Sequence, residues 1–349
     1  MILRLLRRIL PLFAWIVLLG LTSACKDSRP NQAAENIITE GPLAELNARI
    51  AADSTDHEAY AERAMLQLED AAINKALGDI NKALQLKPDH GPYLLILSDL
   101  YFAMGEAQRC RETILKALDV NEYDTDAMIK MAEFGLYHKD YAAVKRYAER
   151  ALSVEDGHPR AHFVLGFSAK EQGDTTLAIR HFRFATESDR DFYDAYIQLG
   201  ILYAAQKDTL AGAYYHTALK LRPESIEALY NLGLHYQETE RFNEAFETYN
   251  RIIRLEPGFK QAYYNIGFIH LVYLGVYDEA ARYFNQAIQV DPNYVEAYYN
   301  RGYSLEKAGD VMGARRDYNK ALELRPNYPL AVEGLNRLDK GDKAMQQVR

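Results

Sequence analysis

The chain has 349 residues, 48% of them hydrophobic and 26% charged, with a formal net charge of −8. This composition is typical of a soluble, well-packed protein and excludes a disordered chain. An acidic balance without a basic run disfavours nucleic-acid binding, which depends on neutralising phosphates. Only two cysteines are present, Cys25 and Cys110, so no disulfide framework is expected.

Residues 1–24 are expected to be a secretory signal peptide. Its basic part holds Arg4, Arg7 and Arg8. An apolar run from Ile9 to Leu21 follows, and its 13 residues are fewer than the ~20 that a membrane-spanning helix needs. Cleavage would leave 38 basic and 49 acidic residues, a balance of −11.

The run Leu21–Cys25 resembles the lipoprotein box of bacterial lipoproteins, although Thr22 stands where a branched aliphatic residue is usual. The resemblance implies that Cys25 is lipidated and anchors an exported chain to a membrane. Lys26 is not the aspartate of an inner-membrane retention signal, and Lys26 with Asp27 is similar to the tag of surface-exported lipoproteins. The outer membrane is therefore expected, on its periplasmic or surface face. The alternative is ordinary signal-peptidase cleavage beside an unmodified cysteine.

Residues 25–41 form a polar stretch without a clear period, which predicts a flexible tether carrying the lipid. A short N-terminal capping helix is expected within residues 42–56. It would place Leu43, Leu46 and Ile50 on one face and shield the first of the repeats that follow.

One pattern then returns at a spacing near 34 residues. A glycine marks its later copies: Gly166, Gly200, Gly233, Gly267 and Gly302. A small residue follows about twelve positions on: Ala178, Ala211, Ala245, Ala280 and Ala314. An aromatic residue comes next: Phe182, Tyr215, Tyr249, Phe284 and Tyr318. Earlier copies hold other small residues in the glycine position, and the eight copies span 57–90, 91–124, 125–158, 159–192, 193–225, 226–259, 260–294 and 295–328.

This spacing, with two amphipathic helical patterns in each copy, resembles the tetratricopeptide repeat. The resemblance implies an all-α solenoid, a right-handed superhelix of about eight helical hairpins with short capping helices at both ends. With its N-terminal lipoprotein box, the chain is similar to tetratricopeptide-repeat lipoproteins of Bacteroidetes.

The recurring residues have physical roles within each hairpin. The glycine and the small residues allow helices A and B to pack closely, and the aromatic residue fills the space they leave. Proline ends helix B in the copies that close on Pro223, Pro257, Pro292 and Pro326. Cys110 falls on a small-residue position and is expected to be a buried substitute for alanine.

Two copies depart from the 34-residue spacing. The fifth is one residue short near Asp208, and the seventh has one extra residue around Tyr273–Gly275. Both changes are expected in the turn between helices A and B, where length changes cost least. Residues 329–338 predict a C-terminal capping helix, and 339–349 a polar tail.

A stripe of apolar residues is expected to form the functional surface. In the tetratricopeptide family, five positions of helix A line a concave groove that holds ligands. The fifth and ninth positions, one helical turn apart, are apolar or aromatic from the fourth copy onward: Phe163, Phe167, Ile197, Ile201, Tyr230, Leu234, Tyr264, Phe268, Tyr299 and Tyr303. We expect none of them to belong to the hairpin core, so the stripe predicts a binding surface. The alternative is that superhelical packing or the N-terminal tether buries it.

Polar residues are expected around this stripe: Asp194, Glu227, Gln237, Glu238, Gln261, Glu296 and Glu306. Asn231, Asn265 and Asn300 occupy the sixth helix-A position. The lysine and asparagine with which co-chaperones of the family bind a C-terminal carboxylate are missing from positions five and nine. The asparagines are therefore expected to form hydrogen bonds within the stack.

No catalytic, cofactor or metal site is predicted. The nine histidines form no H-E-x-x-H pair, and there is no Cys–His cluster with zinc spacing. A glycine-rich phosphate loop and a G-x-S-x-G elbow are also missing. The sequence favours a non-enzymatic, lipid-anchored envelope scaffold that binds a peptide or helix of a protein partner. A glycan-binding lipoprotein and a self-associating structural scaffold are the alternatives, and the oligomeric state is left open.

Overall fold

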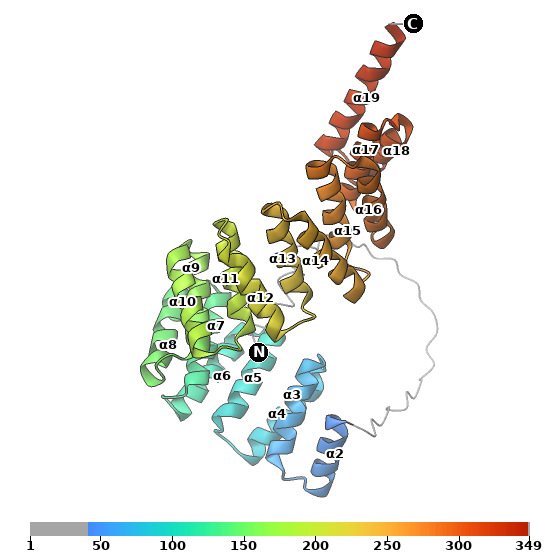
Figure 1. Cartoon of the computed structure of the whole chain (residues 1–349). Coiled ribbons are helices and arrows are strands. Elements are labelled where there is room, and N and C mark those ends of the chain that lie inside the picture. Colours follow the sequence, from blue (N-terminus) through green and yellow to red (C-terminus); the bar gives the residue numbers. More distant parts are fainter. Residues whose placement is uncertain (1–40, 348–349) are drawn as a thin grey trace, which may run out of the picture. The chain divides into compact units, whose positions relative to one another are not determined.

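The computed structural model describes residues 41–347, with side chains up to Lys340. Within this range it contains eighteen α-helices, one π-helix and no strand, which confirms the all-α solenoid (Figure 1). The predicted signal peptide, Cys25 and the tether lie outside the described residues.

The chain divides into two compact units, Met1–Asp189 and Arg190–Arg349, called unit 1 and unit 2 below. The described helices of unit 1 are α2 (Pro42–Ala52), α3 (His57–Glu69), α4 (Ile73–Leu86), α5 (Gly91–Ala103), α6 (Ala107–Val120), α7 (Thr125–Tyr137), α8 (Tyr141–Val154), α9 (Pro159–Glu171) and α10 (Thr175–Ser188). Those of unit 2 are α11 (Tyr193–Ala205), α12 (Leu210–Leu221), α13 (Ile226–Glu238), α14 (Phe242–Leu255), α15 (Lys260–Phe268), the π-helix η1 (Ile269–Leu274), α16 (Tyr277–Val290), α17 (Val295–Ala308), α18 (Val311–Leu324) and α19 (Pro329–Gln347).

Each helical hairpin closes with the same backbone turn. In seven hairpins an N–H after helix A donates to the carbonyl five residues earlier, at 2.7–2.9 Å, as Asp174 does to Ala169. The residue before that N–H is left-handed, for example Gly173 at φ 82°. This arrangement satisfies carbonyl groups at the end of helix A. Helix B begins at the residue after the donating N–H in six of the seven hairpins, and two residues after it in the fifth copy.

The core of each late hairpin is a glycine facing an aromatic ring. A Cβ atom added at Gly200 would stand 2.4 Å from the Tyr215 ring, and one at Gly233 would stand 2.6 Å from the Tyr249 ring. Tyr249 is fully buried. The expected close packing of helices A and B is therefore present, because only glycine leaves room for the ring.

Cys110 has no exposed surface, as expected of a substitute for alanine. Burial, with the nearby Asp99 carboxylate, raises the pKa of its thiol to about 12. A thiol with such a pKa stays protonated at neutral pH and is a poor nucleophile.

The extra residue of the seventh copy is accommodated by the π-helix η1, which continues α15. Here the closing N–H of Val276 donates to the carbonyl of His270, six residues earlier rather than five, at 2.9 Å. Ile269 and Leu271 stay buried, and Gly275 takes the left-handed conformation at φ 66°. A π-turn absorbs one inserted residue in this way, so the helices on either side keep their packing.

The missing residue of the fifth copy lies elsewhere than expected. The turn after α11 has the usual length, because the N–H of Asp208 donates to the carbonyl of Tyr203, five residues earlier, at 2.9 Å. The residue is lost from the first turn of α12. There the Asp208 side chain accepts a bond from the N–H of Leu210, two residues on, whereas Asp174 accepts from Leu177, three residues on.

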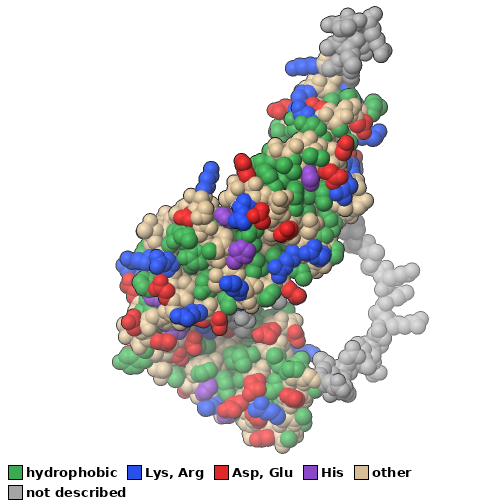
Figure 2. Space-filling model, in the orientation of Figure 1, with side chains coloured by type: hydrophobic (Ala, Val, Ile, Leu, Met, Phe, Trp, Pro, Cys, Tyr) green, Lys and Arg blue, Asp and Glu red, His purple; other side chains and the backbone are tan. Residues whose placement is uncertain are grey.

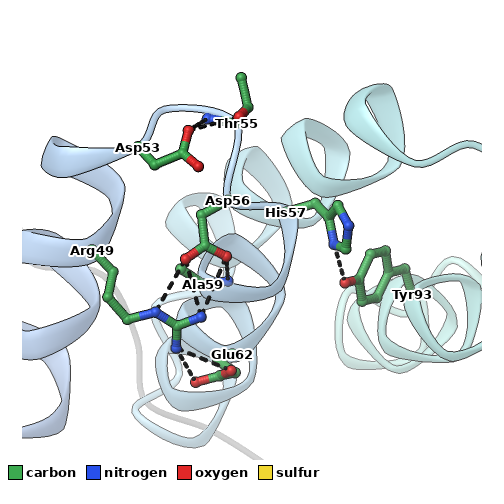
Figure 3. A network of polar contacts seen from close by, with 8 residues as sticks. All are labelled: Arg49, Asp53, Thr55, Asp56, His57, Ala59, Glu62 and Tyr93. Carbon is green, nitrogen blue, oxygen red and sulfur yellow. Dashed lines mark hydrogen bonds and ion pairs between the residues drawn. The ribbon is translucent and has the colours of Figure 1, made fainter.

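Charged side chains attach the N-terminal helix α2 to the first hairpin (Figure 3). From α2, Arg49 donates to both oxygens of Asp56 and of Glu62, at 3.1–3.3 Å. Asp56 also accepts from the N–H of Ala59 and so caps the start of α3. This contact supports the expected capping role of α2.

The C-terminal helix is longer than expected, because α19 continues to Gln347 instead of ending at residue 338. The predicted tail 339–349 is thus helical over most of its length. No proline follows Pro329, and Gly341 alone costs only about 1 kcal/mol, too little to end a helix.

Candidate functional site

The predicted groove residues divide between the units, with Phe163 and Phe167 in unit 1 and the other eight in unit 2. Phe163 and Ile197 are buried, with exposed fractions of 2% and 0%. The expectation that no stripe residue belongs to the core is therefore wrong for these two. Phe163 packs against the core ring of Phe182, with ring centroids 5.5 Å apart. The remaining eight residues are half-buried.

In unit 2 the aromatic pairs form the columns expected from their spacing. The rings of Tyr264 and Phe268 are stacked with centroids 6.4 Å apart. Those of Tyr299 and Tyr303 are 6.2 Å apart, with their planes within 6° of parallel. Each column therefore presents partly exposed ring faces of the kind found in binding hot spots.

A second set of aromatic residues, which the stripe predicted from the repeat did not include, supports these columns. Phe259, Tyr294 and Tyr328 each stand just before the next helix A. Their ring centroids lie 5.4, 5.1 and 5.8 Å from those of Tyr230, Tyr264 and Tyr299, respectively. The signal is visible in the sequence, because each follows a proline by two residues.

Asparagine side chains fix the hydroxyl groups of the tyrosines. Asn300 of α17 donates to the Tyr264 hydroxyl of α15 at 2.7 Å, and Asn265 donates to the Tyr249 hydroxyl at 3.2 Å. These bonds confirm the predicted role of Asn265 and Asn300 within the stack. Burial raises the pKa of Tyr264 to about 12, with smaller contributions from Tyr328 and Glu296. Its ring is thus uncharged at neutral pH.

The last column ends at a charged contact with the C-terminal helix. Arg337 of α19 donates two bonds of 2.9 Å to the carboxylate of Glu306, and its guanidinium lies 5.3 Å from the centroid of Tyr303. Burial alone would raise the pKa of Glu306, but hydrogen bonds from Arg337 and Tyr318 outweigh it and lower the pKa. The carboxylate is therefore ionised and paired with Arg337.

Several of the predicted polar residues serve the fold. Besides the Glu306 pair, Glu296 pairs with Arg325 at 2.8 Å, and the amide oxygen of Gln237 accepts from Tyr249 at 3.2 Å. Glu238, by contrast, makes no ion pair with any residue that the structure describes. The polar border of the aromatic columns is thus only partly available to a ligand.

Two histidines of unit 2 take part in its packing. His216 hydrogen-bonds the Tyr236 hydroxyl at 2.8 Å, while the neighbouring His235 is buried over Gly212. Burial lowers the pKa of both imidazoles. No group of three His, Cys, Asp or Glu side chains suited to a metal ion occurs in the described part of the chain.

An open hollow of about 930 Å³ lies between α12, α13 and α14. Its lining includes the apolar Leu229 and Phe246 and charged residues of both signs, Lys220, Arg254 and Glu247. This mixture of charges indicates no single class of ligand. None of the helices between residues 41 and 347 has the length and apolarity of a membrane span.

The sequence profile of the tetratricopeptide repeat matches residues 209–258 and 268–329. Two human relatives carry similar stretches. Protein O-mannosyl-transferase TMTC3 is 24% identical over 55% of this chain and 22% of that protein. Protein O-mannosyl-transferase TMTC1 is 29% identical over 74% of this chain and 26% of that protein. The chain therefore spans about a quarter of the length of these curated relatives.

Solved structures share the fold at low sequence identity. The C-terminal part of a TPR repeat-containing protein from Cytophaga hutchinsonii superposes with a TM-score of 0.59 at 18% identity, covering 68% of this chain and 98% of that one. Cut9–Hcn1, a hetero-tetramer of the APC/C, gives 0.52 at 16% identity, covering 85% of this chain and 58% of the matched chain. The sequence profile thus shows tetratricopeptide repeats in residues 209–258 and 268–329, and these structures, with the hairpins described above, show that the chain folds as an α-solenoid.

Proposed function

We propose that the protein is a non-enzymatic scaffold of the cell envelope that binds a peptide or helix of a protein partner. The binding surface is the helix-A face of unit 2, which comprises Ile201, Tyr230, Leu234, Tyr264, Phe268, Tyr299 and Tyr303. The observation that carries this proposal is the set of half-buried rings in stacked columns, with Tyr264 and Phe268 at 6.4 Å.

The polar groups around the rings support an apolar mode of binding. The Tyr264 hydroxyl is bonded to Asn300, and the Glu306 carboxylate to Arg337. A ligand that covers the ring faces leaves these groups with their present partners, so it incurs no penalty for unpaired buried polar atoms. Apolar side chains of a partner fit this surface best, since aromatic anchors dominate the energy of protein interfaces.

The attachment to a membrane is part of the same proposal and depends on Cys25. A lipid on Cys25 would hold the scaffold at the outer membrane and raise the local concentration of any partner it binds. Replacing Cys25 by alanine should abolish metabolic labelling with a fatty acid and release the chain from the membrane fraction. Acyl labelling that persists in Cys25→Ala would overturn this attachment.

The binding surface is tested by cross-linked capture from envelope extract, with identification of the captured protein. Leu234→Ser with Phe268→Ser alters position nine, whose residues in unit 2 are all half-buried, whereas position five includes the buried Ile197. Tyr123→Ser with Phe184→Ser is the matched control, because these residues are 65% and 42% exposed in unit 1. One protein captured by the wild type and the control, but lost by the position-nine variant with unchanged circular dichroism, supports the proposal. Equal capture by all three chains contradicts it.

A glycan is the second candidate ligand, and the nearly parallel rings of Tyr299 and Tyr303 favour it. Sugar rings stack on such faces through their C–H groups. Binding of oligosaccharides on an array, lost in Tyr303→Ser, together with no captured protein, would make the glycan the preferred ligand.

A further inference from the structure

The turn that contains η1 differs from every other hairpin turn of the array. In each of the other seven turns, at least one of the three residues directly before helix B is charged. Residues 272–276, which precede α16, carry no charged side chain. Val272 is 55% exposed, Leu274 and Val276 are each 43% exposed, and Tyr273 is 42% exposed. These four residues are called the apolar turn. So many neighbouring exposed apolar side chains indicate an interaction surface.

Aromatic contacts connect the apolar turn to the helix-A face of unit 2. The ring centroid of Tyr273 lies 6.3 Å from that of Phe268, which is itself stacked on Tyr264. On its other side Tyr273 lies 4.9 Å from Phe242, at the start of α14. An occupant that covers Tyr264 and Phe268 can therefore extend over the turn without crossing a polar gap.

Near the apolar turn in the chain, the basic side chains are paired, whereas several acidic side chains are not. The basic groups are already paired, Arg241 with Glu244 at 2.7 Å and Arg282 with Glu279. Glu238, Glu240 and Asp278 stand beside Phe242 and Tyr277 in the chain and make no ion pair with any described residue. These carboxylates favour a cationic occupant and disfavour the anionic surface of a lipid bilayer.

The backbone of this region favours side-chain recognition over strand pairing. The N–H of Val276 is bonded to the carbonyl of His270, and the residues between 41 and 347 form no strand with an open edge. An extended peptide consequently finds no ladder to join, whereas a helix can present one apolar face. Figure 2 shows hydrophobic side chains reaching the surface of the described C-terminal helices between charged ones.

From these observations we propose that the apolar turn, together with Phe268, binds an amphipathic helix of a protein partner whose apolar face is bordered by lysine or arginine. This inference rests on the proposed function and deepens it. It assigns the chemistry of the partner, and it adds the apolar turn to the surface that the partner covers. The inserted residue of the seventh copy then serves binding, because it lengthens the turn that presents Val272 and Leu274.

The test measures fluorescence anisotropy of labelled peptides with the purified full chain. The probe is a peptide of about five helical turns, built from leucine on one face and lysine on the other. One control peptide replaces lysine by glutamate, and another has the same composition in scrambled order. We expect the leucine–lysine helix to bind at least about tenfold more tightly than either control. Binding should weaken when salt is raised from about 0.05 M to about 0.5 M.

The test variant combines Val272→Thr, Leu274→Gln and Val276→Thr. Its matched control makes the same exchanges at Val120, Val154 and Leu210, which are 44%, 44% and 47% exposed. The test variant should lose about tenfold in affinity, and the control should keep the wild-type value. Hydrogen exchange of the wild-type chain checks the site without any mutation, because the bound peptide should slow exchange of amides in residues 270–280.

Three results overturn the inference: equal peptide affinity of the test variant and the wild type, unchanged hydrogen exchange at 270–280, or binding of phosphatidylglycerol vesicles in preference to the peptide. Failure of the inference differs from failure of the proposed function. If Leu234→Ser with Phe268→Ser loses its envelope partner while the apolar-turn variant keeps it, the proposed function stands and the inference fails. If both variants keep the partner, both fail.

Discussion

The early hairpins of unit 1 and the hairpins of unit 2 distribute the volume of their core side chains differently between helices A and B. In the first three hairpins of unit 1 the helix-A position holds Ala64, Ser98 or Ala132, and the facing helix-B position holds Ile80, Ile114 or Ala148, all without exposed surface. In unit 2 the same positions hold glycine and a phenylalanine or tyrosine ring. In the first two hairpins a larger residue on helix A is matched by a smaller one on helix B than in unit 2, so packing constrains the sum of the two side chains there. The third hairpin, where Ala132 faces Ala148, departs from this rule.

The helix-A faces differ in chemistry as well. In unit 1 position nine is acidic in two hairpins, and the following helix A supplies the partner: Lys130 pairs with Asp99, and Arg160 with Glu133 at 2.8 Å. In unit 2 the corresponding contact between successive helices is the bond from Asn300 to Tyr264. At position nine, ion pairs therefore join successive helices A of unit 1, whereas the same position of unit 2 holds apolar or aromatic side chains that a ligand can cover.

The largest effect should come from breaking an ion pair of unit 1. Arg160→Met leaves the fully buried Glu133 without its partner, which should cost about 3–5 kcal/mol of unfolding free energy. Adding Glu133→Gln should recover much of this loss. Chemical denaturation checks both variants. A loss below about 1 kcal/mol in the single variant would mean that the pair is solvated, as surface pairs are.

The second prediction tests the packing of unit 2. Gly267→Leu forces a side chain against the Phe284 ring and the Ala280 carbonyl, where a Cβ atom already stands at 3.1 and 3.2 Å. The free energy of unfolding should fall by about 1–3 kcal/mol or more. Gly267→Ala with Phe284→Ile reproduces the distribution of unit 1 and should be better tolerated. An unchanged melting temperature for Gly267→Leu would show that the repeat register assigned here is incorrect.

A smaller effect is expected where α19 meets unit 2. Arg337→Ala should cost about 1 kcal/mol, because the Glu306 pair is partly exposed. The pKa of Glu306 lies below its ordinary 4.5 in the folded chain, so its contribution is present above that pH and fades as the pH falls. Wild type and Arg337→Ala should therefore differ at pH 7 and converge as the pH falls well below 4.5. A difference independent of pH would assign the loss to packing of the arginine stem.

A pH-dependent effect is expected at a histidine pair of unit 1, which unit 2 lacks among its described residues. The Nδ1 atoms of His162 and His181 lie 3.2 Å apart, and burial, followed by the charges of His162 and Arg180, lowers the pKa of His181 to about 4. Unfolded histidine takes up its proton near 6.5, so unit 1 should lose stability as the pH falls from 6.5 to about 4. His181→Gln should flatten this dependence in thermal melts. An unaltered slope would place its origin in other groups.

The repeat pattern predicted the fold well because it reports packing. Gly267 and Phe284 recur at fixed spacing since each is fitted to the other, and this constraint is visible in a single sequence. The predicted surface was less secure. Phe163 and Ile197 occupy the same positions as Tyr264 and Tyr299, yet they are buried. A position in the repeat gives the direction of a side chain, whereas its exposure depends on what the neighbouring helices and connecting residues place over it.

Residues outside the repeat consensus account for what the sequence did not predict. The contact of Arg337 with Glu306 joins residues 31 positions apart on different helices, and no local pattern encodes it. The helical extension of α19 to Gln347 likewise follows from the lack of a stop signal, which is weaker evidence than the presence of one.

The backbone turn that closes each hairpin has a consequence for how such a chain changes over generations. Its hydrogen bond begins and ends within one hairpin, so a residue added there lengthens the bonded loop from five to six without moving Ala280 or Phe284 out of the core. An inserted residue is absorbed within its own turn, so the packing register of the following hairpins does not change. The tips of these hairpins are therefore places where natural variation or protein engineering can graft new sequence while the stack keeps its phase.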